Sequence, residues 1–220
     1  MKKIFYILLL GISQLILAQN AEQIINKNIQ NTGGLTAWKT LNSVALKGKV
    51  ILGVNEEYPV QIFQQRPNLK KTVFTIKGKE YTIEGYDGHK GYSMNFATNK
   101  LMQVPDYAPE SFDTDFIDYD SKGFTAEYIG KEKIGDLDCY KVELTKNVNK
   151  TTYYFDVHTS MLIREINKDE VLTYYDYRKV GNILLPFKIE SNSLKKEGDY
   201  VLIFNKIEIN KAFPNNTFKF

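Results

Sequence analysis

Cysteine is nearly absent from this sequence of 220 residues: Cys139 is the only one. A single cysteine cannot form an intramolecular disulfide, so the fold must be held by its hydrophobic core even in an oxidising compartment. Histidine is also scarce, and His89 and His158 both follow an Asp in a predicted turn without a second ligand at metal-binding spacing. The sequence therefore predicts no metal site and no cofactor, and both histidines are interpreted as turn residues.

Catalytic motifs are missing as well. No Gly-x-Ser-x-Gly elbow, Ser-x-x-Lys pair or phosphate-cradling glycine loop occurs, and no pair of carboxylates is set apart by apolar surroundings. The formal net charge of +3, from 29 basic and 26 acidic residues, lacks the basic excess that binds nucleic acid. We therefore expect neither an enzyme nor a nucleic-acid-binding protein.

One long apolar run is present, at the N-terminus. Lys2 and Lys3 precede about fourteen residues of apolar bias, fewer than the roughly twenty that a membrane-spanning helix needs. Residues 1–18 are therefore predicted to be a secretory signal peptide, cleaved near Ala18 to within a few residues. Gln19 stands where a lipid-anchored protein would carry Cys. We expect an exported, unlipidated protein in which residues 19–220 form one domain.

Strand patterns fill most of the chain. Alternating apolar residues run from Val44 to Val54, three further strands lie in the region from Val60 to Tyr86, and seven follow Phe124. The connections between the seven strands from Phe124 on are too short for crossover helices, so the sheet is predicted to be antiparallel and sequentially ordered. The fold class is therefore mainly β.

Helices are predicted in only three places. The first begins at Asn20, ends at Gly33 and has Ile25 and Ile29 on its apolar face; a short second helix follows around Trp38. One interpretation is that these helices plug one end of a barrel. The other, that they cover the mouth of a cavity, is implied by the resemblance given below, and the two interpretations are compatible.

The third predicted helix starts at Pro109. Phe112, Phe116 and Tyr119 recur at helical spacing, and acidic residues fall mainly on the other face. That acidic face is either a solvated surface or a docking surface for a basic partner.

Arg66 is the one charged residue that the alternation places on an apolar face. In an extended strand its side chain points the same way as those of Val60, Ile62 and Gln64. A charge there needs hydrogen-bond acceptors, such as carbonyl groups of a lid or a ligand head group, unless the side chain reaches water at the strand end. Pro67 ends the strand because it donates no backbone hydrogen bond.

Short motifs along the chain resemble those of the periplasmic lipoprotein carriers and lipoprotein-sorting proteins, the LolA-like family. The first is Arg-Pro-Asn at residues 66–68, followed about twenty residues later by Tyr-Asp-Gly at 86–88 and by Tyr92. Three more are Phe155-Asp156 with residues 161–163, Tyr175-Asp176-Tyr177, and Leu185-Pro186. The resemblance covers most of the chain after residue 18, although each motif is short.

The resemblance implies a half-open antiparallel β-barrel with short helices as a lid over a lipid-binding cavity. The Arg of the Arg-Pro-Asn motif is associated with holding the lid closed, and this role is carried over to Arg66. The candidates for lining the cavity are Val50, Leu52, Val60, Ile62, Phe74, Ile83, Tyr92 and Met94. The candidates for the lid are Ile25, Ile29, Trp38, Phe112 and Phe116.

The implied function is a monomeric periplasmic carrier that binds lipoprotein acyl chains or other amphiphiles for outer-membrane lipoprotein sorting. Its partners would be a donor protein in the inner membrane and an acceptor protein in the outer membrane. The alternative is a non-transporting envelope sensor or protein-interaction module of the same fold. A third and weaker reading is a hydrolase.

Overall fold

The computed structural model describes residues 21–53, 56–105, 107, 109, 113–195 and 198–220. The predicted signal peptide at residues 1–18 and the lid candidate Phe112 lie outside the described residues.

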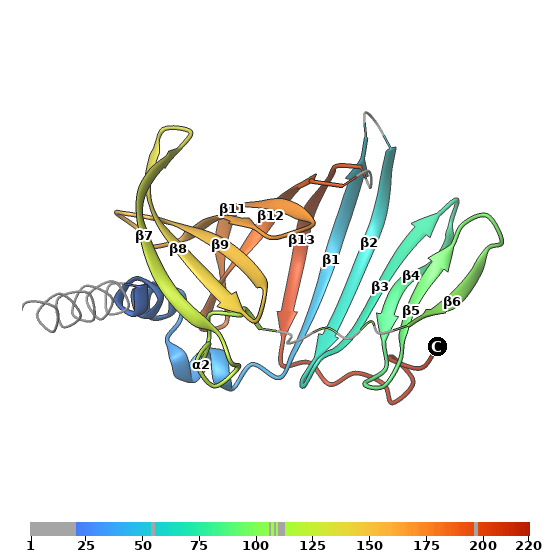
Figure 1. Ribbon diagram of the computed structural model, residues 1–220. Helices are drawn as coiled ribbons and strands as arrows, with labels where there is room; N and C mark the ends of the chain where they lie inside the picture. Colours follow the sequence, from blue (N-terminus) through green and yellow to red (C-terminus); the bar gives the residue numbers. More distant parts are fainter. Residues whose placement is uncertain (1–20, 54–55, 106, 108, 110–112, 196–197) are drawn as a thin grey trace, which may run out of the picture.

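Thirteen strands form one antiparallel sheet (Figure 1). The predicted mainly-β, antiparallel architecture is therefore confirmed. The strands are β1 Ser43–Leu52, β2 Glu56–Gln65, β3 Leu69–Ile76, β4 Lys79–Tyr86, β5 Gly91–Asn95, β6 Lys100–Val104, β7 Thr125–Ile134, β8 Leu137–Lys146, β9 Asn149–Asp156, β10 Leu162–Ile166, β11 Glu170–Val180, β12 Ile183–Ser193 and β13 Tyr200–Ile209.

The order of the strands is that of a barrel opened along one seam. Each strand pairs with its neighbour in sequence except β6 and β7, which lie at the two opposite edges of the sheet. The first strand pairs with the last, β1 with β13, in the middle of the sheet. The connection from β6 to β7 joins the two edges. The predicted half-open barrel is confirmed, and its opening lies between β6 and β7.

Two helices precede the sheet: residues 21–31 are helical, and α2 spans Leu35–Lys39. Gly33 stands between them with a φ of 134°, and a Cβ at this position would lie only 2.3 Å from the carbonyl oxygen of Asn182. Only glycine allows the end of the first helix to approach the turn before β12 so closely. The break predicted at Gly33 therefore has a packing reason as well as a conformational one.

The amphipathic helix predicted to start at Pro109 and to include Phe116 and Tyr119 does not form in the described residues 113–123, so this prediction is wrong. Residues 115–123 form successive turns, and Asp118 has a φ of 52°, which no α-helix contains. The adjacent side chains of Phe116 and Ile117 are both buried, at 4% and 1% exposure. A helix would direct two adjacent side chains about 100° apart, whereas this turn buries both in the same core.

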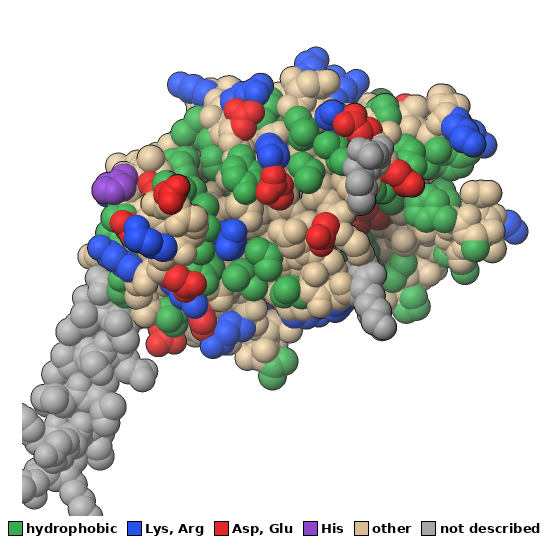
Figure 2. Space-filling view, turned by 90° about the horizontal axis from the view of Figure 1, so that it is seen from above, with side chains coloured by type: hydrophobic (Ala, Val, Ile, Leu, Met, Phe, Trp, Pro, Cys, Tyr) green, Lys and Arg blue, Asp and Glu red, His purple; other side chains and the backbone are tan. Residues whose placement is uncertain are grey.

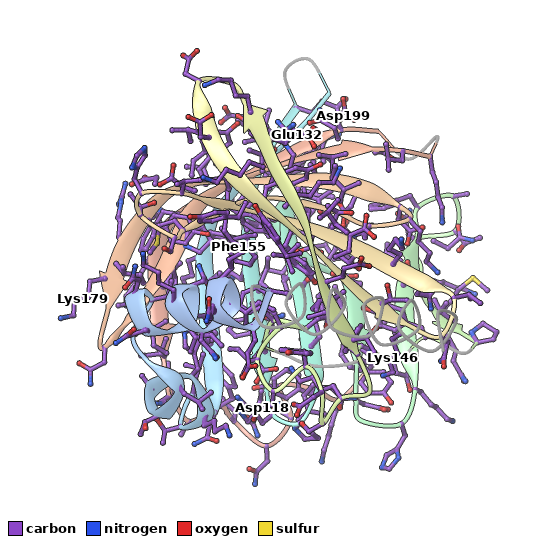
Figure 3. The ribbon with its side chains drawn as sticks, turned by 60° about the vertical axis from the view of Figure 1, so that its left-hand side comes forward. Asp118, Glu132, Lys146, Phe155, Lys179 and Asp199 are labelled. Carbon is purple, nitrogen blue, oxygen red and sulfur yellow. The ribbon has the colours of Figure 1, made fainter. Side chains whose placement is uncertain are left out.

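The hydrophobic core lies in one part of the molecule. Phe155 is at its centre, fully buried and edge-on to Phe116 with ring centroids 5.6 Å apart. Figure 3 shows Phe155 inside the ribbon, with Glu132, Lys179 and Asp199 at the periphery. The buried members of the core cluster come from the two helices, Leu41, the segment 113–124, β1, β8, β9, β10, β12 and β13. No described residue of β2 to β6, called the wing below, is among those buried members.

The chain after β13 packs against the wing on the face opposite the core. The ring of Phe213 meets Phe63 edge-on at 5.5 Å, and the ring of Phe220 stacks on Tyr92 at 4.8 Å. We call this side of the sheet the outer face and the opposite side the inner face. Figure 2 shows charged side chains of both signs interspersed with apolar ones on the face seen from above.

Candidate functional site

Two adjoining cavities lie on the inner face of the sheet. The first cavity lies beneath Trp38 and residues 113–116, and the second lies over β1 to β4; each has a volume of about 410 Å³. Four residues line both cavities: Leu46, Gln64, Ile189 and Phe204. Each volume falls within the roughly 300–1,000 Å³ that is typical of small-molecule sites. The inner face therefore offers one extended, mainly apolar concavity.

Six of the eight residues proposed to line a cavity lie in the second cavity: Val50, Leu52, Val60, Ile62, Phe74 and Ile83. They come together because β1, β2 and β3 pair in register, so that Val60 stands opposite Phe74. Tyr92 lies instead on the outer face, where it stacks on Phe220. Met94 is two residues further along the same strand and shares that face.

The lid candidates fall into two groups. Trp38 and Phe116 line the first cavity, whereas Ile25 and Ile29 point into the hydrophobic core, where they are 1% and 6% exposed. The first helix is also held by hydrogen bonds: the side-chain amide of Asn28 donates to the carbonyl oxygen of Ser160 at 2.7 Å. This helix is thus a structural element of the core, and the parts that cover the cavity are α2 and the segment 113–116.

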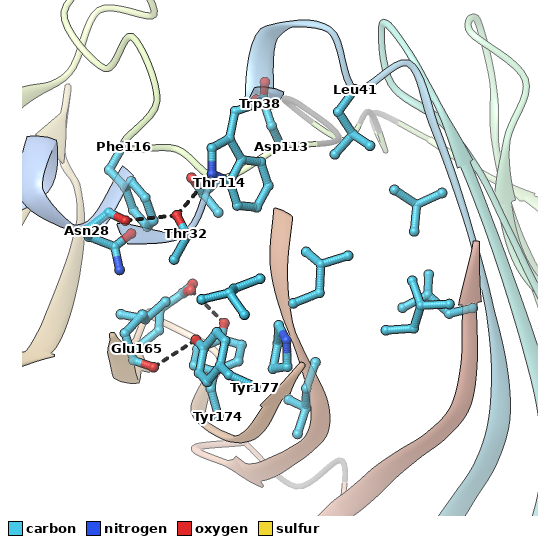
Figure 4. A pocket seen from close by; sticks show the side chains of 18 of the residues that line it. Asn28, Thr32, Trp38, Leu41, Asp113, Thr114, Phe116, Glu165, Tyr174 and Tyr177 are labelled. Atoms are coloured by element: carbon cyan, nitrogen blue, oxygen red, sulfur yellow. Dashed lines mark hydrogen bonds between the residues drawn. The ribbon is translucent and has the colours of Figure 1, made fainter. Parts of the chain in front are cut away.

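Trp38 is fixed over the first cavity by a buried hydrogen bond. Its indole Nε1 donates to the hydroxyl of Thr32 at 3.0 Å, and that hydroxyl donates to the carbonyl oxygen of Asn28 at 2.8 Å (Figure 4). The backbone carbonyl of Thr32 accepts in turn from the amide of Leu184 at 2.9 Å. The covering indole is therefore connected through the first helix to β12.

Arg66 connects the end of β2 to both covering segments. Its Nε donates to the carbonyl oxygen of Leu41 at 2.7 Å, and its guanidinium donates to the carbonyl oxygen of Trp38 at 3.0 Å. The same guanidinium makes a 2.7 Å ion pair with Asp113. The arginine thus bonds to one carbonyl oxygen inside α2 and to one just after it. It also bonds to Asp113 in the segment that connects β6 to β7.

Asp113 is the shared partner of two cations. Its carboxylate is only 4% exposed and bonds to Arg66 through one oxygen and to the ammonium of Lys122 through the other, at 2.8 Å. A buried carboxylate is stable only with such partners. Lys122 also donates to the carbonyl oxygen of Thr114 at 2.8 Å. This cluster of three charged residues fastens the loop to the wing at the rim of the first cavity.

The second cavity contains its own charged pair. Lys70 and Glu84 are 2.7 Å apart, and the hydroxyl of Thr72 donates to Glu84 at 3.0 Å. Burial disfavours the ionised form of Glu84, but the neighbouring ammonium outweighs it and lowers the carboxyl pKa. Burial by itself would lower the pKa of Lys70, but the attraction and hydrogen bond of Glu84, together with Tyr107 and Tyr200, raise it. The carboxylate of this cavity is therefore neutralised by a partner on the adjacent strand.

The first cavity contains a carboxyl group that the sequence did not indicate. Glu165 lines it together with Tyr174 and Tyr177, and the hydroxyl of Tyr174 donates to Glu165 at 2.9 Å (Figure 4). Burial, supported by the nearby carboxyl of Asp115, raises the pKa of Glu165 to about 7.

A β-bulge explains why alternation misses Glu165. The pairing of β10 with β9 shifts between Leu162 and Arg164, so Leu162 and Glu165 both face the cavity although they are three residues apart. A regular strand would have placed Arg164 there. No pattern in the sequence marks this bulge in advance.

Cys139 and the two histidines offer no reactive group at the cavities. Burial raises the thiol pKa of Cys139 to about 11, with Asp156 adding to the effect, so little thiolate forms. The backbone amides of His89 and His158 donate to Asp87 and Asp156 in their turns, at 2.7 and 3.1 Å. Within the described ranges no group of three or more His, Cys, Asp or Glu side chains could hold a metal ion.

An open antiparallel sheet with a covered apolar concavity defines a half-barrel of the LolA-like type. An outer membrane lipoprotein-sorting protein domain from Vibrio parahaemolyticus has a similar fold, with a TM-score of 0.63 at 11% identity over 92% of this chain and 97% of that one. A DUF1329 family protein from Desulfovibrio piger matches equally well, with a TM-score of 0.63 at 11% identity and the same coverage of both chains.

A LolA superfamily protein from Nitrosomonas europaea is similar too, with a TM-score of 0.58 at 13% identity over 91% of this chain and 97% of that one. No family model and no curated protein matches this sequence. At such low identity the likeness shows the fold and not the ligand. Among the residues that the structure describes, no helix has both the length and the apolar character needed to cross a bilayer.

Proposed function

We propose that this protein is an exported carrier that binds one acyl chain, or a small group of chains, of a lipoprotein or other amphiphile on the inner face of its sheet. The observation that carries the proposal is the pair of adjoining apolar cavities of about 410 Å³ each. Each buried CH₂ group of a chain contributes about 0.8 kcal/mol, so a soluble carrier needs an apolar concavity of this kind.

Release of the ligand requires that the concavity can open, and the arrangement of Arg66 supports a latch. The wing holds few core residues, and the bonds from Arg66 to the Trp38 and Leu41 carbonyl groups and to Asp113 fasten the cover to it. In our proposal these bonds exist in the closed, empty form and break when a chain enters. Binding then exchanges polar contacts at the rim for apolar contacts inside.

The proposal extends to location and partners. Residues 1–18 would direct the chain to the periplasm, where it would work as a monomer between a donor at the inner membrane and an acceptor at the outer membrane. Its action is binding and transfer, without a covalent step. N-terminal sequencing of the protein from the envelope fraction tests the export step, and an intact Met1 there would contradict it.

Ligand binding is tested with N-phenyl-1-naphthylamine, a neutral apolar dye that fluoresces on entering an apolar site. Leu202 lines the second cavity, whereas its neighbour Val201 is equally half-buried on the other face of β13. Leu202→Gln places an amide in the cavity and should weaken dye binding about tenfold, because the buried amide lacks partners. Val201→Gln is the matched control and should bind the dye as wild type does.

Two outcomes would count against the carrier. If wild type leaves the dye unbound, the inner face is not a binding site. If both variants weaken binding equally, the loss reflects the fold rather than the cavity. Either result would favour a sensor or protein-interaction module.

A further inference from the structure

The first cavity differs from the second in the charge of its lining. Among the described residues that line it, none is Lys, Arg or His, whereas Asp113, Asp115 and Glu165 contribute carboxyl groups. Asp113 is paired with Arg66 and Lys122 at the rim. Glu165 has no ion-pair partner among the described residues, and the second cavity's Glu84 is neutralised by Lys70. The first cavity therefore has a carboxyl group in its lining without a cation beside it in the described part of the chain, whereas the carboxylate of the second cavity is paired.

Glu165 is built into the cavity wall by neighbouring strands. The hydroxyl of Tyr174 on β11 donates to it at 2.9 Å, and the hydroxyl of Tyr177 is directed elsewhere, to the carbonyl oxygen of Leu162 at 2.8 Å. The β10 bulge turns the carboxyl group inward. A carboxyl group of this kind can accept further hydrogen bonds because an ionised carboxylate has about four acceptor positions.

The covering loop supplies a second, independent sign that a polar group enters the cavity. The Oγ1 of Thr114 is buried there and has no hydrogen-bond partner in the part of the chain that the structure describes. Such a buried hydroxyl is costly unless something bonds to it. Figure 4 shows Thr114 on the covering side of the cavity and Glu165, Tyr174 and Tyr177 on the sheet side. The apolar lining thus has polar acceptors on two opposite sides.

We propose that the first cavity selects amphiphiles whose head group carries a protonated amine, with Glu165 as the specificity-determining residue. This inference rests on the proposed function and names the ligand class of that same site. The alkyl chain would extend along the shared lining at Leu46 and Phe204 towards the second cavity. The ammonium would donate to the Glu165 carboxylate, and a charge-assisted hydrogen bond of this kind is about twice as strong as a neutral one.

The protonation state of Glu165 should make the binding of amines depend on pH. The titratable groups that face it are Asp115, Tyr153, Glu170 and Tyr174. Because burial raises its pKa to about 7, the carboxylate is mostly present above that pH and mostly absent below it. The preference for an amine should therefore increase as the pH rises through about 7.

The test uses three probes with the same twelve-carbon chain: dodecylamine, dodecanol and dodecanoate, each kept below its micelle concentration. Displacement of N-phenyl-1-naphthylamine gives their affinities at pH 8 and pH 5.5. At pH 8 we expect dodecylamine to bind about tenfold or more tightly than dodecanol, and dodecanoate to bind more weakly than dodecanol. At pH 5.5 the difference between amine and alcohol should fall to about threefold or less.

Glu165→Gln should abolish the amine preference and its pH dependence while dodecanol binds as before. Glu190→Gln is the matched control, because Glu190 accepts from Tyr175 at the same 2.9 Å but lines neither cavity and is paired with Lys188. This control should retain the preference. A preference that survives Glu165→Gln, or dodecanoate binding as well as dodecylamine to wild type, would overturn the proposal and leave the carrier function standing. If the dye binds nowhere, both are wrong.

Discussion

The half of the sheet from β7 to β13 and the wing from β2 to β6 share one hydrogen-bonded sheet but differ in what covers them. The half from β7 to β13, called the core half below, packs against the first helix and the loop with Phe116 and Ile117. The wing presents Phe74, Ile83 and their neighbours to a cavity and contributes no buried member of the core cluster from the residues described. The buried core cluster therefore lies outside the wing, while the wing presents apolar side chains to a cavity.

The two regions also differ in the partners of their buried carboxyl groups. In the wing, Lys70 and Glu84 neutralise one another. Across the concavity, Glu165 is bonded to a tyrosine hydroxyl instead of a cation. A carboxyl group is thus paired with a cation in one region, and in the other it is bonded to a hydroxyl and has a pKa that burial raises.

The largest effect should come from removing a ring in the core half. Phe155→Ala deletes a fully buried side chain in contact with Phe116, and we expect the free energy of unfolding to fall by about 3–5 kcal/mol. Phe74→Ala in the wing should cost only about 1 kcal/mol, since that ring is half-buried and faces a cavity. Chemical denaturation measures both. Comparable losses for the two variants would remove the distinction between the halves.

If Phe155→Ala does not fold, Phe155→Leu replaces it. The smaller change should still destabilise more than Phe74→Leu, because only the first leaves a cavity in a packed core.

A pH-dependent effect of similar size is expected at Glu165. Its pKa of about 7 in the folded protein lies above the ordinary value of 4.5, so the folded state holds this proton more tightly than the unfolded state. The group's contribution to stability is therefore present at pH 4 and is lost as the pH rises through about 7. Glu165→Gln cannot ionise, and relative to wild type it should gain up to about 3 kcal/mol between pH 4 and pH 8.

Glu190→Gln should show the opposite sign. A hydrogen bond from Lys188 lowers the pKa of Glu190, so this carboxylate stabilises the folded state above its unfolded pKa and the variant loses relative stability as the pH rises. Unfolding curves at pH 4, 6 and 8 measure both variants. A pH-independent difference between Glu165→Gln and wild type would show that Glu165 titrates normally.

A smaller effect, on rate rather than stability, is expected at the latch between the two halves. Arg66→Leu removes the bonds to the Trp38 and Leu41 carbonyl groups and to Asp113, so the closed, empty form is disfavoured and a bound lipid should leave about tenfold or more slowly. Arg66→Lys should be intermediate, because an ammonium lacks the planar fork that reaches several acceptors. Transfer of a fluorescent lipid to acceptor vesicles gives the rates. Equal rates in all three folded proteins would show that the bonds of Arg66 do not control release of the lipid.

The alternation of apolar residues in the sequence predicts which side chains face the cavity, but only where the strands are regular. The pairing of β1 with β2 has no register shift, so the expectation that Val60, Ile62 and Gln64 share one face with an arginine at its end agrees with the geometry. Around β10 a bulge reverses the alternation and brings Glu165 inward. Bulges depend on the contacts between strands, which the sequence of a single strand does not reveal.

The loop around Phe116 shows a second reason why prediction from the sequence fails. Phe116 and its neighbours have helical spacing, yet burial of the adjacent Phe116 and Ile117 and the positive φ of Asp118 favour turns. Tertiary packing outweighs local periodicity in a segment this short. Tyr92 was misplaced for a related reason: it packs against Phe220, and an aromatic strand residue can face either side of a sheet.

The most direct test of the central claim, that the inner face holds an amphiphile, is native mass spectrometry of the protein purified from the envelope without detergent. The account predicts that wild type and Val201→Gln carry a bound lipid or acylated molecule, and that Leu202→Gln carries much less. Wild-type protein that is empty in every preparation, or Leu202→Gln that is loaded as fully as wild type, would contradict it.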